Sequence, residues 1–254
     1  MNLPNHPIDT IVRDLRALGV RENGVLLVHA SLRSLGLPSS MPSRAEVALL
    51  GLMDALGPRG TLLMPALSYE TVGAHNPVFD VHNTPGCVGA LPEAFRLRPG
   101  VLRSVHPTHS VCGAGPRAQL LLEGHIHDAT PVGPRSPFAR LPHEDGQILF
   151  LGCGLRPNTS MHGIEERVEP PYLYGPQVDY RIILRDGSET AMRVRSHNFK
   201  GWTQRYDRVE NVLPEGIARG RVLQADCFLI EASALWKYAL EKIQAESLYF
   251  VDKD

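Results

Sequence analysis

One predicted helix carries a histidine and two carboxylates. Glu165 and Glu166 follow His162 by three and four residues, and both spacings place a carboxylate on the histidine's face of a helix. Such a carboxylate can orient the imidazole, while the start of the helix disfavours the protonated ring. A neutral, oriented imidazole is suited to act as a general base toward an amine nucleophile. The alternative is an exposed His–Glu pair worth at most roughly a few tenths of a kcal/mol.

A second candidate is the polar segment that follows the first predicted strand. A loop leaving a buried strand can offer backbone N–H groups and hydroxyls to an anion such as a phosphate. The segment matches neither the P-loop nor the GxGxxG pattern, so the alternative is a polar connection capped by its first serine. Its residues are Ser31, Leu32, Arg33, Ser34, Leu35 and Gly36.

A histidine-rich turn forms the third candidate. His106 precedes a proline, so its backbone should be extended, and His109 and Ser110 could then point into a cleft. The sequence lacks a GxSxG nucleophile elbow here, which argues against a serine hydrolase. The alternative is a loop whose histidines hydrogen-bond to the backbone.

Metal binding has one weak candidate. His125, His127 and Asp128 superficially resemble the paired-histidine motifs of some metal-dependent hydrolases, but they follow a helix-like segment instead of a strand end. We therefore expect a solvated turn and no metal, and keep a metal-dependent hydrolase as an alternative.

The amino-acid composition limits the classes of function that the protein can have. The chain has 254 residues, of which 43% are hydrophobic and 21% charged, with a formal net charge of -1. These values are typical of a globular protein and show no basic excess for nucleic acid or an anionic membrane. No apolar stretch approaches the about 20 residues of a membrane helix, and residues 1–13 show no signal peptide. The four dispersed cysteines form no CxxC motif, so we expect reduced thiols in a cytoplasmic protein.

Apolar periodicity predicts the elements that must position these residues. Buried strands alternate with helices, which favours a single α/β domain over residues 1–254, with a mixed, mostly parallel central sheet and helices on both faces. A hairpin over 178–185 and 189–195, turning at Asp186-Gly187, is expected to extend that sheet in antiparallel fashion. We predict helices over 8–18, 43–56, 88–97, 160–168 and 231–243, strands over 25–28, 61–64, 147–151 and 222–228, and a loop over 68–86.

Taken in order, these segments resemble the aminoglycoside 3-N-acetyltransferase family over about residues 8–245. The resemblance implies an α/β fold distinct from the GNAT acetyltransferases, acetyl-CoA as donor, a small amine as acceptor and no metal. The segments that carry it are 29–36, 60–65, 84–85 with 89–96, 103–104 with 106–110, Gly133 with 136–141, and 158–160 with His162 and Glu165, followed by His197 upstream of Arg205.

The resemblance also implies a site. The segment from Ser31 to Gly36 would hold the coenzyme A, with His109, Ser110 and Ser136 lining the same cleft. His162 and Glu165 would stand at the reacting centre, and we expect direct transfer within a ternary complex. A cationic acceptor needs carboxylates, for which the candidates are Asp80, Glu93 and Glu166.

Two departures from the family pattern concern the acceptor. Ala30 stands where the family commonly has serine, and Ala66 where it has threonine. The alternatives are therefore a coenzyme A-dependent N-acyltransferase for another small amine, the metal-dependent hydrolase, or a coenzyme A-binding protein without transferase activity. We expect acetyl-CoA and a small amine as partners, no nucleic acid and no membrane, and leave open a homodimer.

Overall fold

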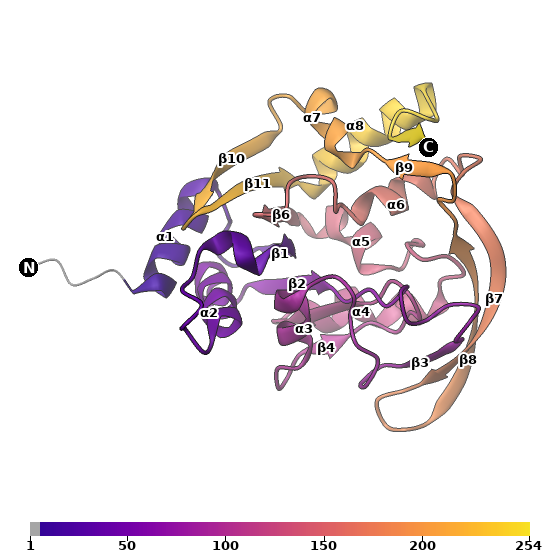
Figure 1. Cartoon of the computed structure of the whole chain (residues 1–254), viewed down its shortest axis with the longest axis horizontal. Coiled ribbons are helices and arrows are strands. Elements are labelled where there is room, and N and C mark those ends of the chain that lie inside the picture. Colours follow the sequence, from indigo (N-terminus) through magenta and orange to yellow (C-terminus); the bar gives the residue numbers. More distant parts are fainter. Residues whose placement is uncertain (1–5) are drawn as a thin grey trace, which may run out of the picture.

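The computed structural model describes residues 6–254, and a seven-stranded mixed sheet forms its centre (Figure 1). Its strands are β1 (Val25–Ala30), β2 (Thr61–Pro65), β4 (Leu102–Arg103), β5 (Val111–Ala114), β6 (Gln147–Leu151), β10 (Ile217–Val222) and β11 (Ala225–Glu231). Their order across the sheet is β10-β11-β6-β1-β2-β5-β4.

The three central strands are buried on both faces. Along β1, Leu26 and Val28 pack into one hydrophobic core, whereas Val25 and Leu27 pack into a second core on the other side. Because alternate side chains of a strand point to opposite faces, a strand covered on both sides is a continuous apolar run. This pattern made β1, β2 and β6 recognisable in the sequence, and the structure confirms them.

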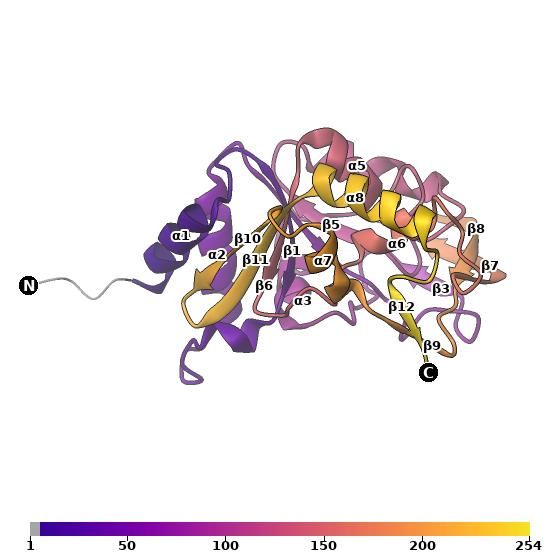
Figure 2. The same ribbon diagram turned by 90° about the horizontal axis from the view of Figure 1, so that it is seen from above.

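Helices cover both faces, as predicted. Figure 2 shows α1 (Pro7–Leu18) and α2 (Arg44–Leu56) on one side and α8 (Ala232–Ala245) on the other. The first core contains α1, α2 and α3 (Ala90–Arg96). The second core contains α8 with four short helices, α4 (Ala118–Leu122), α5 (Pro137–Arg140), α6 (Ser160–Glu165) and α7 (Val209–Val212). None of the described helices is long and apolar enough to cross a bilayer.

Two smaller sheets lie beside the main one. The first contains β3 (Val78–Asp80), β7 (Tyr174–Ile183) and β8 (Glu189–His197), and the second pairs β9 (Trp202–Gln204) with β12 (Val251–Lys253). The predicted hairpin is β7–β8, but its expected place as an extension of the main sheet is wrong. Its inward side chains, such as Tyr180 and Val194, form a separate core with Phe79.

The α/β class with a mixed sheet is confirmed, but the sheet is less parallel than predicted. Among the described strands of the main sheet, only the pairs β1–β2 and β1–β6 are parallel, while β10–β11, β11–β6, β2–β5 and β4–β5 are antiparallel. The strand predicted over 222–228 corresponds to β11, which begins at Ala225 after a short turn that follows β10, with Leu223 at a left-handed φ of 52°. The loop over 68–86 contains β3, and α6 ends at Glu165 instead of residue 168.

Candidate active site

A cavity of about 650 Å³ opens beyond the carboxyl ends of β1, β2 and β6. Open α/β sheets place their sites at this edge because loops with free side chains converge there. The other wall of the cavity comes from the hairpin, including Val178 and Tyr180 of β7 and His197 of β8. The polar side chains that line it include His29, His109, Arg156, Asn158, His162, His197 and Tyr206.

His162 and Glu165 form the predicted pair on α6. His162 Nδ1 lies 3.2 Å from Glu165 Oε2, and the histidine side chain is 11% exposed while the glutamate is fully buried. Sequence spacing left open whether Glu165 or Glu166 orients the ring. The structure places Glu165 against it, whereas Glu166 contacts His197.

Two tyrosines complete the surroundings of the Glu165 carboxylate. Tyr172 donates its hydroxyl to Oε1 at 2.8 Å, and Tyr206 donates to Oε2 at 2.7 Å. Tyr206 Oη also lies 3.0 Å from His162 Nδ1. Since the single tyrosine proton is used by the carboxylate, these contacts require the histidine proton on Nδ1. The lone pair of Nε2 is then free.

Glu166 serves a second histidine. Its Oε1 lies 2.8 Å from His197 Nε2, and it accepts hydrogen bonds from Thr130 Oγ1 at 2.5 Å and from the Val132 N–H at 2.8 Å. Burial raises the pKa of Glu166 to about 7. Burial also holds the pKa of His197 well below its usual value, and the neighbouring His162 adds to this effect.

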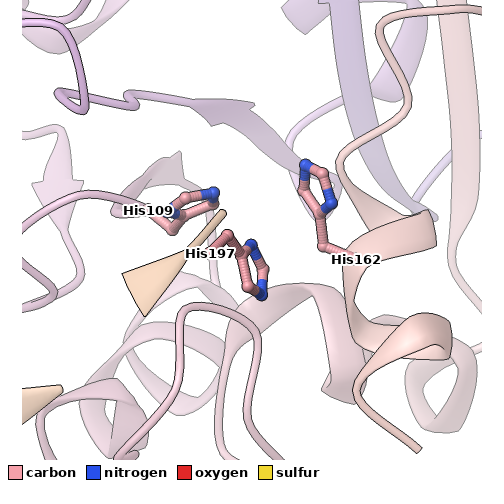
Figure 3. Close-up of side chains that lie close together, drawn as sticks. All are labelled: His109, His162 and His197. Carbon is pink, nitrogen blue, oxygen red and sulfur yellow. The ribbon is translucent and has the colours of Figure 1, made fainter. Parts of the chain in front are cut away.

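Three imidazoles from distant parts of the chain meet in the cavity (Figure 3). The ring centre of His162 lies 4.9 Å from that of His197 and 5.6 Å from that of His109. Burial lowers the pKa of His109 far below its usual value. Burial and then the charge of His162 lower the pKa of His29 to about 3. The rings around His162 are therefore neutral at neutral pH.

The sequence matches a family model described as aminoglycoside 3-N-acetyltransferase over residues 27–244. The chain belongs to this family. It is 30% identical to aminoglycoside N(3)-acetyltransferase VIII of Streptomyces fradiae, over 92% of this chain and 91% of the relative. It is 29% identical to aminoglycoside N(3)-acetyltransferase IX of Micromonospora chalcea, over 97% of this chain and 98% of the relative. The predicted family and enzyme class are confirmed.

A solved structure shows the same fold. It is a histidine-to-alanine variant of aminoglycoside acetyltransferase AAC(3)-IVa in complex with a gentamicin. It is 30% identical, with a TM-score of 0.82 over 98% of this chain and 93% of that chain.

In this aminoglycoside 3-N-acetyltransferase family member, the predicted coenzyme A residues separate into two groups. His109 lines the cavity, but Ser110 and Ser136 do not. The Ser110 hydroxyl donates to Ala66 O at 2.8 Å and accepts from Arg103 Nε at 2.9 Å. Ser136 caps α5, where its Oγ accepts from the Ala139 N–H at 3.2 Å. Both serines therefore hold local backbone in place.

At the end of β1, Ala30 is the last residue that lines the cavity. The predicted phosphate-binding segment starts at the next residue, Ser31, and does not line the cavity. A 3-10 turn spans Leu32–Leu35 and ends at Gly36, whose φ of 68° is left-handed. Ser34 Oγ donates to Gly152 O at 2.8 Å and lies 2.9 Å from Ser31 Oγ. These contacts anchor the segment to the end of β6, and its role in coenzyme A binding stays a prediction.

None of the three predicted acceptor carboxylates lines the cavity, and Glu166 instead contacts His197. Asp80 accepts hydrogen bonds from the backbone N–H groups of His82 and Asn83, each at 2.8 Å. Glu93 pairs with Arg96 at 2.6 Å and accepts from the Gly86 N–H at 2.9 Å. Both carboxylates stabilise turns, and the geometry gives no support to a role in amine binding.

The paired-histidine metal motif does not form a ligand set. His125 is buried with Nδ1 2.9 Å from Ser104 Oγ and Nε2 3.1 Å from Pro131 O. Asp128 accepts the Arg135 N–H at 3.0 Å. Because both ring nitrogens of His125 have hydrogen-bond partners, neither is free to bind the metal ion that the hydrolase alternative requires.

Sequence reasoning missed the two tyrosines and His29. Tyr206 reaches the site from a 3-10 turn, and Tyr172 from the loop before β7. Neither stands at a motif spacing from His162. His197 was named only as part of the family resemblance, because its position depends on how the hairpin packs.

The contribution of the two tyrosine hydroxyls to the stability of the protein should be measurable. Tyr206→Phe and Tyr172→Phe each remove a donor to a buried carboxylate, which should lower the free energy of unfolding by about 1.5–3 kcal/mol. Urea denaturation measures this value. Tyr238→Phe is the control, because Tyr238 is 43% exposed and its substitution should change stability by less than about 0.5 kcal/mol. Equal effects of all three would contradict the hydrogen-bond network.

Proposed function

We propose that this enzyme transfers the acetyl group of acetyl-CoA to the 3-amino group of an aminoglycoside, with His162 as general base. The family and the names of its relatives support the reaction. The geometric observation that supports the mechanism is the His162 ring, which Glu165 contacts at Nδ1 at 3.2 Å while the ring lines the cavity. The cytoplasmic location and a homodimer are predictions that rest on the sequence.

The chemistry needs a base because an alkylammonium has no free lone pair. The ammonium first releases one proton to solvent, which frees the lone pair. Nε2 of His162 then accepts a second proton as the amine nitrogen attacks the thioester carbonyl carbon. The tetrahedral intermediate collapses with cleavage of the C–S bond, and the imidazolium returns the proton to the coenzyme A thiolate. Glu165 stabilises the transient imidazolium through Nδ1–H.

The neighbouring histidines suit this role. Burial keeps the pKa values of His29, His109 and His197 low, so these rings are neutral. Since they add no positive charge, they repel neither the ammonium substrate nor the imidazolium that forms on His162.

His162→Ala should lower kcat by about 10²–10⁴-fold while coenzyme A binding persists, because the base is lost but the cofactor contacts remain. Acetylated product measured by mass spectrometry gives turnover, and calorimetry gives coenzyme A affinity. His143→Ala is the control, since His143 is an exposed histidine outside the cavity. Near-full turnover of His162→Ala would exclude the assignment.

One observation favours a second acceptor class, a small amine with fewer charges. Among the described residues that line the cavity there is no aspartate or glutamate, and Arg156 carries a positive charge. An aminoglycoside carries several ammonium groups, which acidic walls would attract and an arginine would repel. The absence of Ser at Ala30 and Thr at Ala66 also alters the polar surroundings.

A screen of kcat/KM separates the two acceptor classes. We expect gentamicin and sisomicin to exceed simple primary monoamines by at least about tenfold, because several contacts position a larger acceptor. NMR of the product identifies the acylated nitrogen. Preference for monoamines would move the enzyme to the second class and leave the role of His162 intact.

A further inference from the structure

We infer that His109, His162 and His197 form a binding site for a divalent transition-metal ion, with Zn²⁺ the best fit, and that occupancy of this site blocks acetyl transfer. One ring nitrogen from each histidine lies within 4.8 Å of the others. Figure 3 shows the three rings around one space, with His162 on the side of α6 and the other two facing it.

Each ring has one nitrogen engaged and one available. His162 Nδ1 contacts Glu165, His197 Nε2 contacts Glu166, and His109 Nδ1 lies 2.9 Å from Thr108 Oγ1. The other nitrogens of His162 and His109 have no hydrogen-bond partner among residues 6–254. His197 Nδ1 is buried and also lacks a partner. A buried ring nitrogen without a partner is costly in free energy, and a metal ion would satisfy it.

The engaged nitrogens match the arrangement found around protein-bound metals. A metal-ligating histidine usually donates its second N–H to a carboxylate, a carbonyl or another oxygen acceptor, which fixes the tautomer and the ring orientation. Here Glu165, Glu166 and Thr108 supply the oxygens. The Glu165 carboxylate also places negative charge behind His162, which offsets part of the charge of a divalent ion.

The ligand chemistry favours zinc. Three neutral imidazoles with a fourth position open to a cavity are typical of zinc sites, whereas Mg²⁺ and Ca²⁺ prefer oxygen ligands. Tetrahedral coordination with Zn–N bonds of about 2.0–2.1 Å needs nitrogens about 3.3 Å apart. Starting from separations within 4.8 Å, side-chain rotations that close each gap by about 1.5 Å or less suffice.

Binding would compete with the proposed chemistry at one atom. The lone pair of His162 Nε2 cannot bind a metal and accept the proton of the amine at the same time. The ion is thus an inhibitor and not a cofactor. This inhibitory half rests on the proposed function, whereas the metal site itself does not.

The binding test uses chelator-treated, full-length enzyme without coenzyme A, because thiols bind zinc. Titration with Co²⁺ as spectroscopic probe, followed by Zn²⁺ competition, should show one ion per chain with tetrahedral visible absorption. His197→Ala and His109→Ala should each weaken affinity by at least about 100-fold. His127→Ala should bind like the wild type, since His127 is an exposed histidine outside the cluster.

Circular dichroism of the metal-free variants establishes that both remain folded. Absence of Co²⁺ and Zn²⁺ binding by the wild type would overturn the site, as would wild-type affinity in both folded cluster variants. Loss of binding in His127→Ala alone would place the ion elsewhere and overturn it too.

The inhibition test measures acetylated product by mass spectrometry at increasing free Zn²⁺. Turnover should fall in parallel with occupancy and return when a chelator is added. Unchanged turnover at full occupancy would overturn the inhibitory half. If His162→Ala proved fully active, the proposed base would fail while the binding titration still decided the metal site.

Discussion

The structure of the site depends on one buried charge. The Glu165 carboxylate has no solvent exposure and is satisfied by Tyr172, Tyr206 and His162. A carboxylate in a low-dielectric interior is tolerated only when donors replace its lost water. The same donors fix its position, so the requirement to satisfy the charge also orients His162.

The fold meets this requirement by joining distant segments at one sheet edge. The end of β6 leads through a short loop into α6, which supplies His162 and Glu165. The turn before α7 supplies Tyr206, and the β7–β8 hairpin closes the cavity with His197. Because the hairpin has its own hydrophobic core, it can form a wall without being a strand of the main sheet. The packing of this separate sheet thus decides which side chains face His162.

Local patterns were predictable, and long-range ones were not. The His162–Glu165 contact followed from helical spacing, and β1, β2 and β6 from their apolar runs. The alternation in the hairpin identified two strands, but alternation does not specify which sheet they join. The polar segment after β1 looked suited to an anion, yet Ser34 hydrogen-bonds to Gly152.

The partners of the acidic residues could not be predicted from the sequence. Asp80 and Glu93 have the right charge for a cationic acceptor, but turns and an arginine engage them. A carboxylate's charge is visible in the sequence, whereas its partner is set by tertiary packing. For the same reason, no sequence pattern identified the tyrosines that donate to Glu165. Tyr172 is 7 residues and Tyr206 is 41 residues away from Glu165 in the chain.

The central claim is that Glu165 holds His162 with its proton on Nδ1 and a free lone pair on Nε2. Long-range ¹H–¹⁵N correlation NMR of ¹⁵N-histidine-labelled enzyme at neutral pH measures this tautomer directly, with His162→Ala used for assignment. We expect a protonated Nδ1 and an unprotonated Nε2 for His162. A proton on Nε2 with a bare Nδ1 would contradict it.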